Sequence, residues 1–299
     1  MIGYATKCSI LLFLVLLLPA LCLAEETAPS FQQRIQEGDQ HWDLRAEGSQ
    51  GSKADPKEID QAVFAYRQAL LVDTESLAAR WRLMRALYFK AEYTPNSNEE
   101  KKKIFEEGKG IGEEALQRIR QDAARRTGKS LGKAGPVELA NLLKGSENVV
   151  ECFFWSSADW GGWALAFGKL PAAREGAATK IRDLATAVIL MDQNYAEGGG
   201  YRVLGRLHHQ TPAIPFITGW ASTKEAVVLL RHAVEIGPRD LLNRLYLAEA
   251  LWDLNRDSHE EARKIIEGLG NDQPRAQFLV EDKAVQEKAQ ALWMSWNKN

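Results

Sequence analysis

The spacing of apolar residues constrains the fold more than any other feature of this chain. From residue 31 onward they recur every three or four positions, and prolines interrupt the pattern. This spacing places apolar side chains on one face of an α-helix, and a proline ends a helix because it has no backbone N–H. Strand-like alternation is scarce, so we expect an all-α fold. The interruptions predict about twelve helices, at residues 31–46, 57–73, 76–93, 98–122, 136–145, 147–168, 172–192, 199–210, 221–237, 240–254, 258–268 and 280–297.

A degenerate tetratricopeptide pattern indicates how these helices pack. The pattern covers about 34 residues, with small residues where two helices cross and large residues between the crossings. Its clearest copy runs from Tyr201 to Pro238, a second covers residues 247–269, and residues 62–74 match the second helix of an earlier copy. One helix pair cannot bury its apolar face alone, so we expect about five stacked pairs and a terminal helix. The irregular spacings favour a compact, closed array over an open superhelix.

Residues 1–24 have the composition of a secretory signal peptide. Lys7 precedes a short apolar run, and small residues form a cleavage site that ends at Ala24. We expect export, cleavage after Ala24, and a mature chain of residues 25–299 that forms a single helical-repeat domain. A lipid anchor at Cys22 is the alternative, and the bulky Leu21 before that cysteine argues against it.

Two polar, glycine-rich stretches interrupt the helical pattern. Residues 46–55 predict a flexible insertion in the first helix pair, because Gly- and Ser-rich segments behave as random coils. Residues 125–135 predict a second surface bulge. Neither stretch is predicted to be a domain boundary, because helices of the same type continue on both sides.

Charge, cysteine usage and missing motifs exclude several classes of function. The formal net charge is −2, which gives no general attraction to nucleic acid. Cys152 is the only cysteine beyond the leader, so no internal disulfide can form. The glycines of residues 108–112 follow no strand, and they predict tight helix contacts rather than a nucleotide loop. His208 and His209 are adjacent and therefore diverge on a helix. We expect no metal site, no cofactor and no catalytic activity.

Aromatic residues are the strongest candidates for a binding surface. The chain has nine Trp, three of which fall in the predicted helix 147–168, and further aromatic residues follow prolines in the segment 212–220. Apolar side chains gathered in this way either fill the array between helix pairs or line a cleft or partner face. The sequence is compatible with both interpretations. The candidate binding residues are Trp155, Trp160, Trp163, Tyr201, Arg202, Phe216 and Trp220.

Arg202 is the charged member of this set. It stands near the start of the predicted helix 199–210, directly after a run of three glycines that permits close backbone approach. We expect Arg202 to form a salt bridge with Asp159 or Asp192. An anionic ligand group is the alternative partner.

Two segments of the chain carry a family resemblance. Residues 153–161 read Phe-Phe-Trp-Ser-Ser-Ala-Asp-Trp-Gly, and residues 192–205 lead from Asp-Gln-Asn-Tyr into Gly-Gly-Tyr-Arg-Val-Leu-Gly. Residues 38–42 also fit a Gly-Asp-x-x-Trp element near the mature start. Together these segments resemble the T-component family of tripartite ATP-independent periplasmic (TRAP) transporters. The resemblance spans most of residues 33–270 and is most specific in the middle of the chain.

The resemblance implies a helical periplasmic protein built from cryptic tetratricopeptide-type repeats. It also implies assembly as a trimer, binding to the transporter's solute-binding subunit, and a role in guiding an apolar ligand. The family often has a glycine-rich loop where this chain has residues 212–220, so a passage there would have a different shape.

The sequence therefore favours a non-catalytic accessory subunit of a TRAP-type transporter that binds the solute-binding subunit through its helical array. The alternative is a general tetratricopeptide-like scaffold of the cell envelope that displays a peptide groove. A third interpretation is a carrier of a hydrophobic small molecule with the aromatic candidates near its cleft, and it is compatible with the first.

Overall fold

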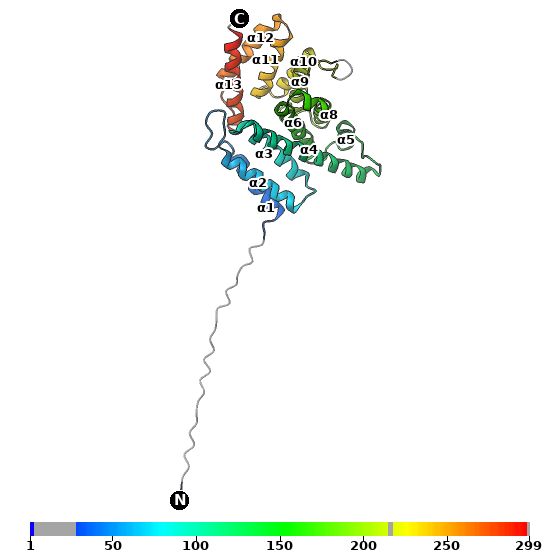
Figure 1. Cartoon of the computed structure of the whole chain (residues 1–299), viewed down its shortest axis with the longest axis vertical. Helices are drawn as coiled ribbons and strands as arrows, with labels where there is room; N and C mark the ends of the chain where they lie inside the picture. Colours follow the sequence, from blue (N-terminus) through cyan, green and yellow to red (C-terminus); the bar gives the residue numbers. More distant parts are fainter. Residues whose placement is uncertain (3–27, 215–217, 298–299) are drawn as a thin grey trace.

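The computed structural model describes residues 1–2, 28–214 and 218–297, which fold as helices and loops (Figure 1). The expected all-α class is confirmed, since no strand occurs in these ranges. None of the described helices is long and apolar enough to cross a membrane. Apart from Met1 and Ile2, the predicted signal peptide up to Ala24 lies outside the described residues. The α-helices are α1 (Phe31–Asp43), α2 (Pro56–Val72), α3 (Leu77–Tyr93), α4 (Asn98–Thr127), α5 (Pro136–Leu142), α6 (Val149–Phe167), α7 (Lys169–Arg174), α8 (Ala177–Met191), α9 (Gly199–Gln210), α10 (Thr223–Ile236), α11 (Leu241–Leu254), α12 (His259–Asn271) and α13 (Leu279–Trp296).

Two predicted helices differ clearly from the structure. The prediction of one helix over residues 172–192 is wrong, because the chain breaks at Gly176, whose φ is 66°. Glycine adopts this left-handed conformation without the steric cost that a side chain would add. α4 continues beyond the predicted end at residue 122 to Thr127, and it ends at Gly128, which is also left-handed.

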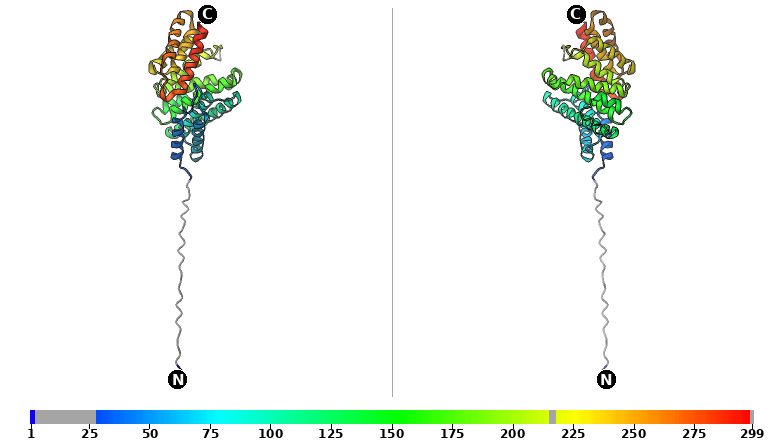
Figure 2. Two further views of the ribbon diagram at one scale, coloured as in Figure 1. Left: turned by 90° about the vertical axis from the view of Figure 1, so that its left-hand side faces the viewer. Right: turned by 90° about the vertical axis from the view of Figure 1, so that its right-hand side faces the viewer.

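The helices pack as successive pairs, as the repeat pattern predicts. α1 packs on α2, α3 on α4, α6 on α8, α9 on α10, and α11 on α12, while α13 follows as the terminal helix. Neighbouring pairs stack on one another, and Figure 2 shows the stack from its two sides, with the N-terminal helices at the bottom and the C-terminal helices at the top. Small buried side chains lie at the crossings, which lets the helices approach closely.

The first helices of four pairs, together with α13, form a closed cycle. α3 contacts α6, α6 contacts α9, α9 contacts α11, α11 contacts α13, and α13 returns to α3. The last contact joins the two ends of the array, and Val280 of α13 is fully buried in the apolar cluster formed by α1, α2 and α3. The array is therefore a ring, consistent with the closed form expected from the irregular spacings.

The far end of α13 is held by stacked aromatic rings. The rings of Trp296 and Trp252 lie parallel with their centroids 4.2 Å apart, and the His259 ring stacks on Trp252 at 3.8 Å. Arg263 donates a hydrogen bond to the carbonyl of Trp296 at 3.1 Å. These contacts fix α13 against α11 and α12.

Two glycines of α4 mark its closest contact with α6. A Cβ on Gly108 would lie 2.7 Å from the carboxyl carbon of Asp159, and one on Gly112 would collide with Ser156. Gly110 faces open space. The predicted tight helix contact is thus present at Gly108 and Gly112.

Residues 46–55, predicted as a flexible insertion, make specific contacts. Gln50 and Lys53 form an isolated bridge, and the Ala54 N–H donates to the carbonyl of Tyr93 at 2.8 Å. The Ser52 N–H donates to the carboxylate of Glu287 in α13 at 3.2 Å. The segment therefore lies where the first pair meets the terminal helix.

Candidate functional site

The cycle of inner helices brings together aromatic and charged side chains that are far apart in the sequence. Tyr88 of α3 lies 5.9 Å from the ring of Trp155 in α6. The Arg202 guanidinium of α9 lies 5.9 Å from the ring of Phe154, also in α6. We call the following half-buried side chains the inner face: Tyr88, Tyr93, Trp155, Arg202, Arg206, Tyr246, Glu249 and Glu281.

Contacts continue around the inner face to α13 and back to α3. Arg206 of α9 lies 4.3 Å from the Tyr246 ring of α11, and the exposed Lys288 of α13 lies 5.9 Å from the same ring. On α13, Glu281 forms an ion pair with Arg45 at 3.0 Å, and the guanidinium of Arg45 lies 5.4 Å from the Phe89 ring of α3. Side-chain contacts therefore link the inner helices all the way around the ring.

The cations of the inner face are each paired with a carboxylate. The Nη1 atom of Arg206 lies 2.9 Å from the Glu249 carboxylate, whose other oxygen is 3.0 Å from the Nζ atom of Lys288. Arg202 pairs with Asp240 at 3.4 Å. Arg206 and Lys288 share the one Glu249 carboxylate, so these three side chains together keep one net positive charge.

Three tyrosine hydroxyls remain free on this face. Within the described part of the chain, the hydroxyls of Tyr88, Tyr93 and Tyr246 make no hydrogen bond, and they are not among its solvent-shielded unpaired atoms. Burial raises the pKa of Tyr88 well above its ordinary value, and the nearby Tyr93, Glu92 and Tyr246 raise it further. The phenols therefore stay protonated and can donate or accept hydrogen bonds.

Polar atoms of α6 are also left without partners. The indole Nε1 of Trp155 and the Oε2 atom of Glu151 are shielded from solvent and have no hydrogen-bond partner among the described residues. These two residues are four positions apart, so they share one face of the helix. Buried polar atoms in native proteins nearly always have partners. Of the two, Trp155 lies beside Tyr88 at the inner face. Both Trp155 and Glu151 lie near Tyr195, in the loop before α9.

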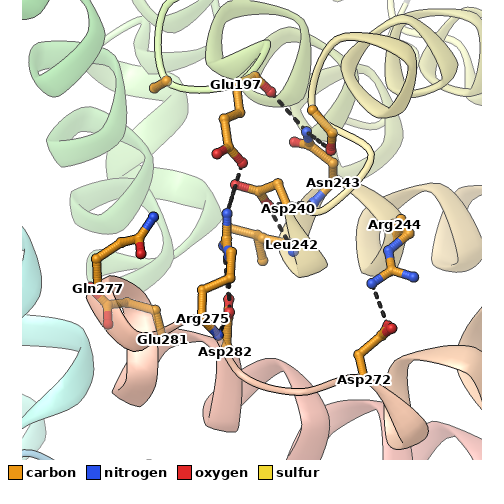
Figure 3. A network of polar contacts seen from close by, with 12 residues as sticks. Glu197, Asp240, Leu242, Asn243, Arg244, Asp272, Arg275, Gln277, Glu281 and Asp282 are labelled. Carbon is orange, nitrogen blue, oxygen red and sulfur yellow. Dashed lines mark hydrogen bonds and ion pairs between the residues drawn. The ribbon is translucent and has the colours of Figure 1, made fainter.

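A network of ion pairs joins the inner face to the start of α13 (Figure 3). Arg275 forms two hydrogen bonds with the buried Asp282 at 2.8 and 2.9 Å and one with Glu197 at 2.7 Å. Asn243 donates to the carbonyl of Glu197 at 2.9 Å. The network ties the segment before α13 to α11 and to the loop that precedes α9.

Two predicted site residues, Trp160 and Trp163, lie in the core between α4 and α6. Their exposed fractions are 2% and 4%. The Trp163 ring stacks on Phe167 at 4.8 Å, and its indole donates a hydrogen bond to Glu106. Among the three tryptophans predicted in this helix, only Trp155 belongs to the inner face.

Arg202 forms the expected salt bridge, but with another partner. The prediction of Asp159 or Asp192 is wrong, because Arg202 pairs with Asp240 and donates to the side chain of Asn243 at 2.8 Å. Asp240 is the N-cap of α11 and lies 38 positions further along the chain. Tyr201, the next predicted residue, is half-buried beside the ring of His232 in α10, at 5.5 Å.

Trp220 borders a surface hollow of about 540 Å³ between α9 and α10. Its ring meets that of His208 edge-on at 5.0 Å, and the Arg182 guanidinium lies 5.2 Å from the ring. Burial lowers the pKa of His208. Phe216, the remaining predicted residue, lies outside the described residues.

Sequence reasoning missed most of the inner face. Within α3, residues 81, 85, 88 and 92 fall on one helical face, which therefore carries Trp, Arg, Tyr and Glu together. Only Tyr88 of this stripe belongs to the inner face, because Trp81 donates to Asn148 and Arg85 lies over the ring of Trp42 in α1. No local pattern marks Tyr246 of α11, because its place beside Arg206 and Lys288 depends on how the distant helices pack.

Comparison with known proteins assigns no family to this chain. No protein-family model matches the chain. No curated protein matches it either. Among the described residues, no group of three or more His, Cys, Asp or Glu side chains is placed to hold a metal ion.

Proposed function

We propose that this protein is a non-catalytic accessory subunit of a TRAP-type transporter in the periplasm, where it binds the solute-binding subunit. The observation that carries the proposal is the inner face, on which Tyr, Trp and Arg side chains of four helices lie. These three residue types dominate the energetics of protein interfaces. Helical-repeat proteins use such assembled surfaces to bind other chains.

Two of the three segments that resemble the T-component family each contribute one residue to this surface, Trp155 of α6 and Arg202 of α9. Gly199 and Gly200 allow α9 to pack closely against Phe154 and Ile189, and this packing places Arg202 beside Asp240. The resemblance therefore falls on residues that shape the inner face. A trimer, as the resemblance implies, is part of the same proposal. An apolar ligand would need another surface, because charges and hydroxyls line this one.

The test is an affinity capture from native periplasm, using residues 25–299 as bait, followed by crosslinking and mass spectrometry. We compare the unaltered chain with Arg206→Ala on the inner face. Arg231→Ala is the matched control, since Arg231 is an exposed arginine of α10 that pairs with Glu261. We expect the unaltered chain and the control to retain an extracytoplasmic solute-binding protein, and the inner variant to retain less.

Other outcomes of the capture decide against the proposal. Recovery of outer-membrane or envelope-assembly proteins alone would favour the general scaffold. Recovery of no periplasmic protein would remove the transporter role. Light scattering of the purified chain tests the trimer separately, and a monomer at all concentrations would contradict it.

A further inference from the structure

The last residues of α4 and the segment that follows them form an exposed basic surface. Residues 125–147, which we call the basic tip, contain five Lys or Arg and two Asp or Glu, a net charge of +3 in a chain whose formal net charge is −2. Figure 1 shows the end of α4 and the loop to α5 at the outer edge of the molecule, away from α13. We infer that the basic tip docks on the surface of a phospholipid bilayer that contains anionic lipid, through its cations and the exposed Leu142.

Most cations of the basic tip have no carboxylate partner. Among the described residues, Arg125 is the only one of the five that forms an ion pair, with Asp122. The other four cations are exposed: Arg126, Lys129, Lys133 and Lys144. Charges left without a counterion on one end of a molecule attract anions, and this attraction extends about 8 Å from the surface at physiological ionic strength.

The core of the protein holds these cations in place. Leu131 and Ala134 of the loop after α4 are buried, and the Nε atom of Arg120 donates to the carbonyl of Ala134 at 2.8 Å. Arg126 donates to the hydroxyl of Ser146 at 2.7 Å, which joins the end of α4 to the segment after α5. The cations therefore gather at one end of the molecule before any partner binds, so docking does not require this segment to fold.

The composition of the basic tip favours a lipid surface over a protein surface. Protein interfaces are enriched in aromatic residues, Met and Arg, and they are depleted in Lys. Residues 125–147 contain no Phe, Tyr, Trp or Met, and three of their five cations are Lys. Lysine carries a compact charge on a flexible stem, which suits the many mobile phosphates of a bilayer. Leu142 is 41% exposed two positions before Lys144, and it offers an apolar contact with the boundary between headgroups and acyl chains.

Vesicle co-sedimentation of residues 25–299 tests the inference. The vesicles contain either phosphatidylcholine alone or phosphatidylcholine mixed equally with phosphatidylglycerol. We expect binding to the mixed vesicles only, and weaker binding as the salt concentration rises. No binding to the mixed vesicles, or equal binding to both kinds, would overturn the inference.

A triple variant removes the lysines of the basic tip: Lys129→Gln, Lys133→Gln and Lys144→Gln. Their side chains form no ion pair or hydrogen bond among the described residues, so thermal melting should be unchanged. Each Lys or Arg near an anionic bilayer strengthens binding about fivefold, so we expect the triple variant to bind the mixed vesicles about a hundredfold more weakly.

A second triple variant is matched in charge and lies outside the basic tip. It combines Lys103→Gln, Lys169→Gln and Lys224→Gln, which replace three exposed lysines of α4, α7 and α10. We expect this control to bind the mixed vesicles about as well as the unaltered chain does. An equal loss in both triple variants would show that binding follows the net charge of the whole chain, and it would overturn the inference.

Leu142→Ala tests the apolar contact separately. About half of this side chain is already removed from water, so burial of the remainder predicts roughly threefold weaker binding of the variant to the mixed vesicles. Unchanged binding would overturn this part of the inference.

The outcomes separate this inference from the transporter role. If the mixed vesicles bind the chain but no solute-binding protein is captured from periplasm, only the transporter role fails. If no vesicle binds, and the lysine variant of the basic tip captures less of a periplasmic protein than its control does, the basic tip is a protein-binding surface and this inference is overturned.

Discussion

At the scale of single residues, the buried carboxyl of Asp159 has the clearest effect on stability. This carboxyl is 0% exposed, packs against the backbone of Gly108, and has no hydrogen-bond partner on either oxygen in the described chain. Burial raises the pKa of Asp159 well above its ordinary value of 3.8, and the negative charge of Glu107 raises it further. The folded protein therefore keeps a proton here that the unfolded chain releases.

This difference predicts a pH dependence of stability. The free energy of unfolding should fall as pH rises above about 4, by about 1.4 kcal/mol per unit until the folded-state pKa is reached. Asp159→Asn removes the titrating group, so the variant should gain stability over the unaltered chain between pH 5 and pH 8 (on the order of one or more kcal/mol). Urea unfolding at several pH values measures this gain. Asp257→Asn, at an exposed position, is the control, and parallel pH profiles for all three proteins would refute the prediction.

Cys152 offers a second test at this scale. The thiol is buried, and burial raises its pKa, so little thiolate forms near neutral pH. We expect folded residues 25–299 to react with a thiol reagent such as dithionitrobenzoate at least a hundredfold (roughly) more slowly than the urea-unfolded chain. Rapid stoichiometric reaction of the folded protein would show that this part of α6 opens readily.

At the scale of elements, the contact of α4 with α6 depends on where glycine stands. Alanine is more favourable than glycine inside a helix by about 0.5–1 kcal/mol. At Gly110, where a Cβ meets nothing, Gly110→Ala should therefore raise stability by that amount. At Gly108 the added Cβ would lie 2.7 Å from Asp159, so Gly108→Ala should lower stability by about 1–3 kcal/mol. Urea unfolding of both variants gives the two signs. An equal change in the free energy of unfolding in both variants would contradict a close contact between α4 and α6 at Gly108.

At the scale of the whole molecule, Arg45 joins the two ends of the array. Its guanidinium is buried between Trp42 and Phe89, pairs with Glu281, and donates to the carbonyl of Gln277. Arg45→Ala would leave the Glu281 carboxylate half-buried without its cation. We expect a loss of about 2–4 kcal/mol in the free energy of unfolding, together with a larger radius of gyration in solution scattering.

A surface ion pair provides the control for ring closure. Arg67 pairs with Glu107 at the exterior, and Arg67→Ala should cost less than about 1 kcal/mol. Combining Arg45→Ala with Glu281→Gln measures the coupling of the pair, because the double variant should lose less than the sum of the single losses. An unchanged radius of gyration in Arg45→Ala would show that the buried Val280 and the Arg275 network hold the ring closed without it.

Local sequence information was sufficient for the helices and for some of their contacts. The three- and four-residue spacing of apolar residues reports which face of each helix is buried, and prolines and glycines report where helices end. Gly108 and Gly112 were recognisable as a close contact because only a small residue suits such a crossing. The break at Gly176 was missed, since a glycine within a helical pattern does not by itself reveal a positive φ.

The closure of the ring was decided by tertiary structure. Periodicity shows that a face is buried, but it does not show which distant helix covers that face, because any apolar face satisfies it. Arg202 therefore pairs with Asp240 rather than Asp159. Tyr88 lies beside Trp155, and Trp160 is in the core while Trp155 is on the inner face. These arrangements depend on the crossing angles of all five stacked helix pairs together. No single segment of the sequence determines all of those angles.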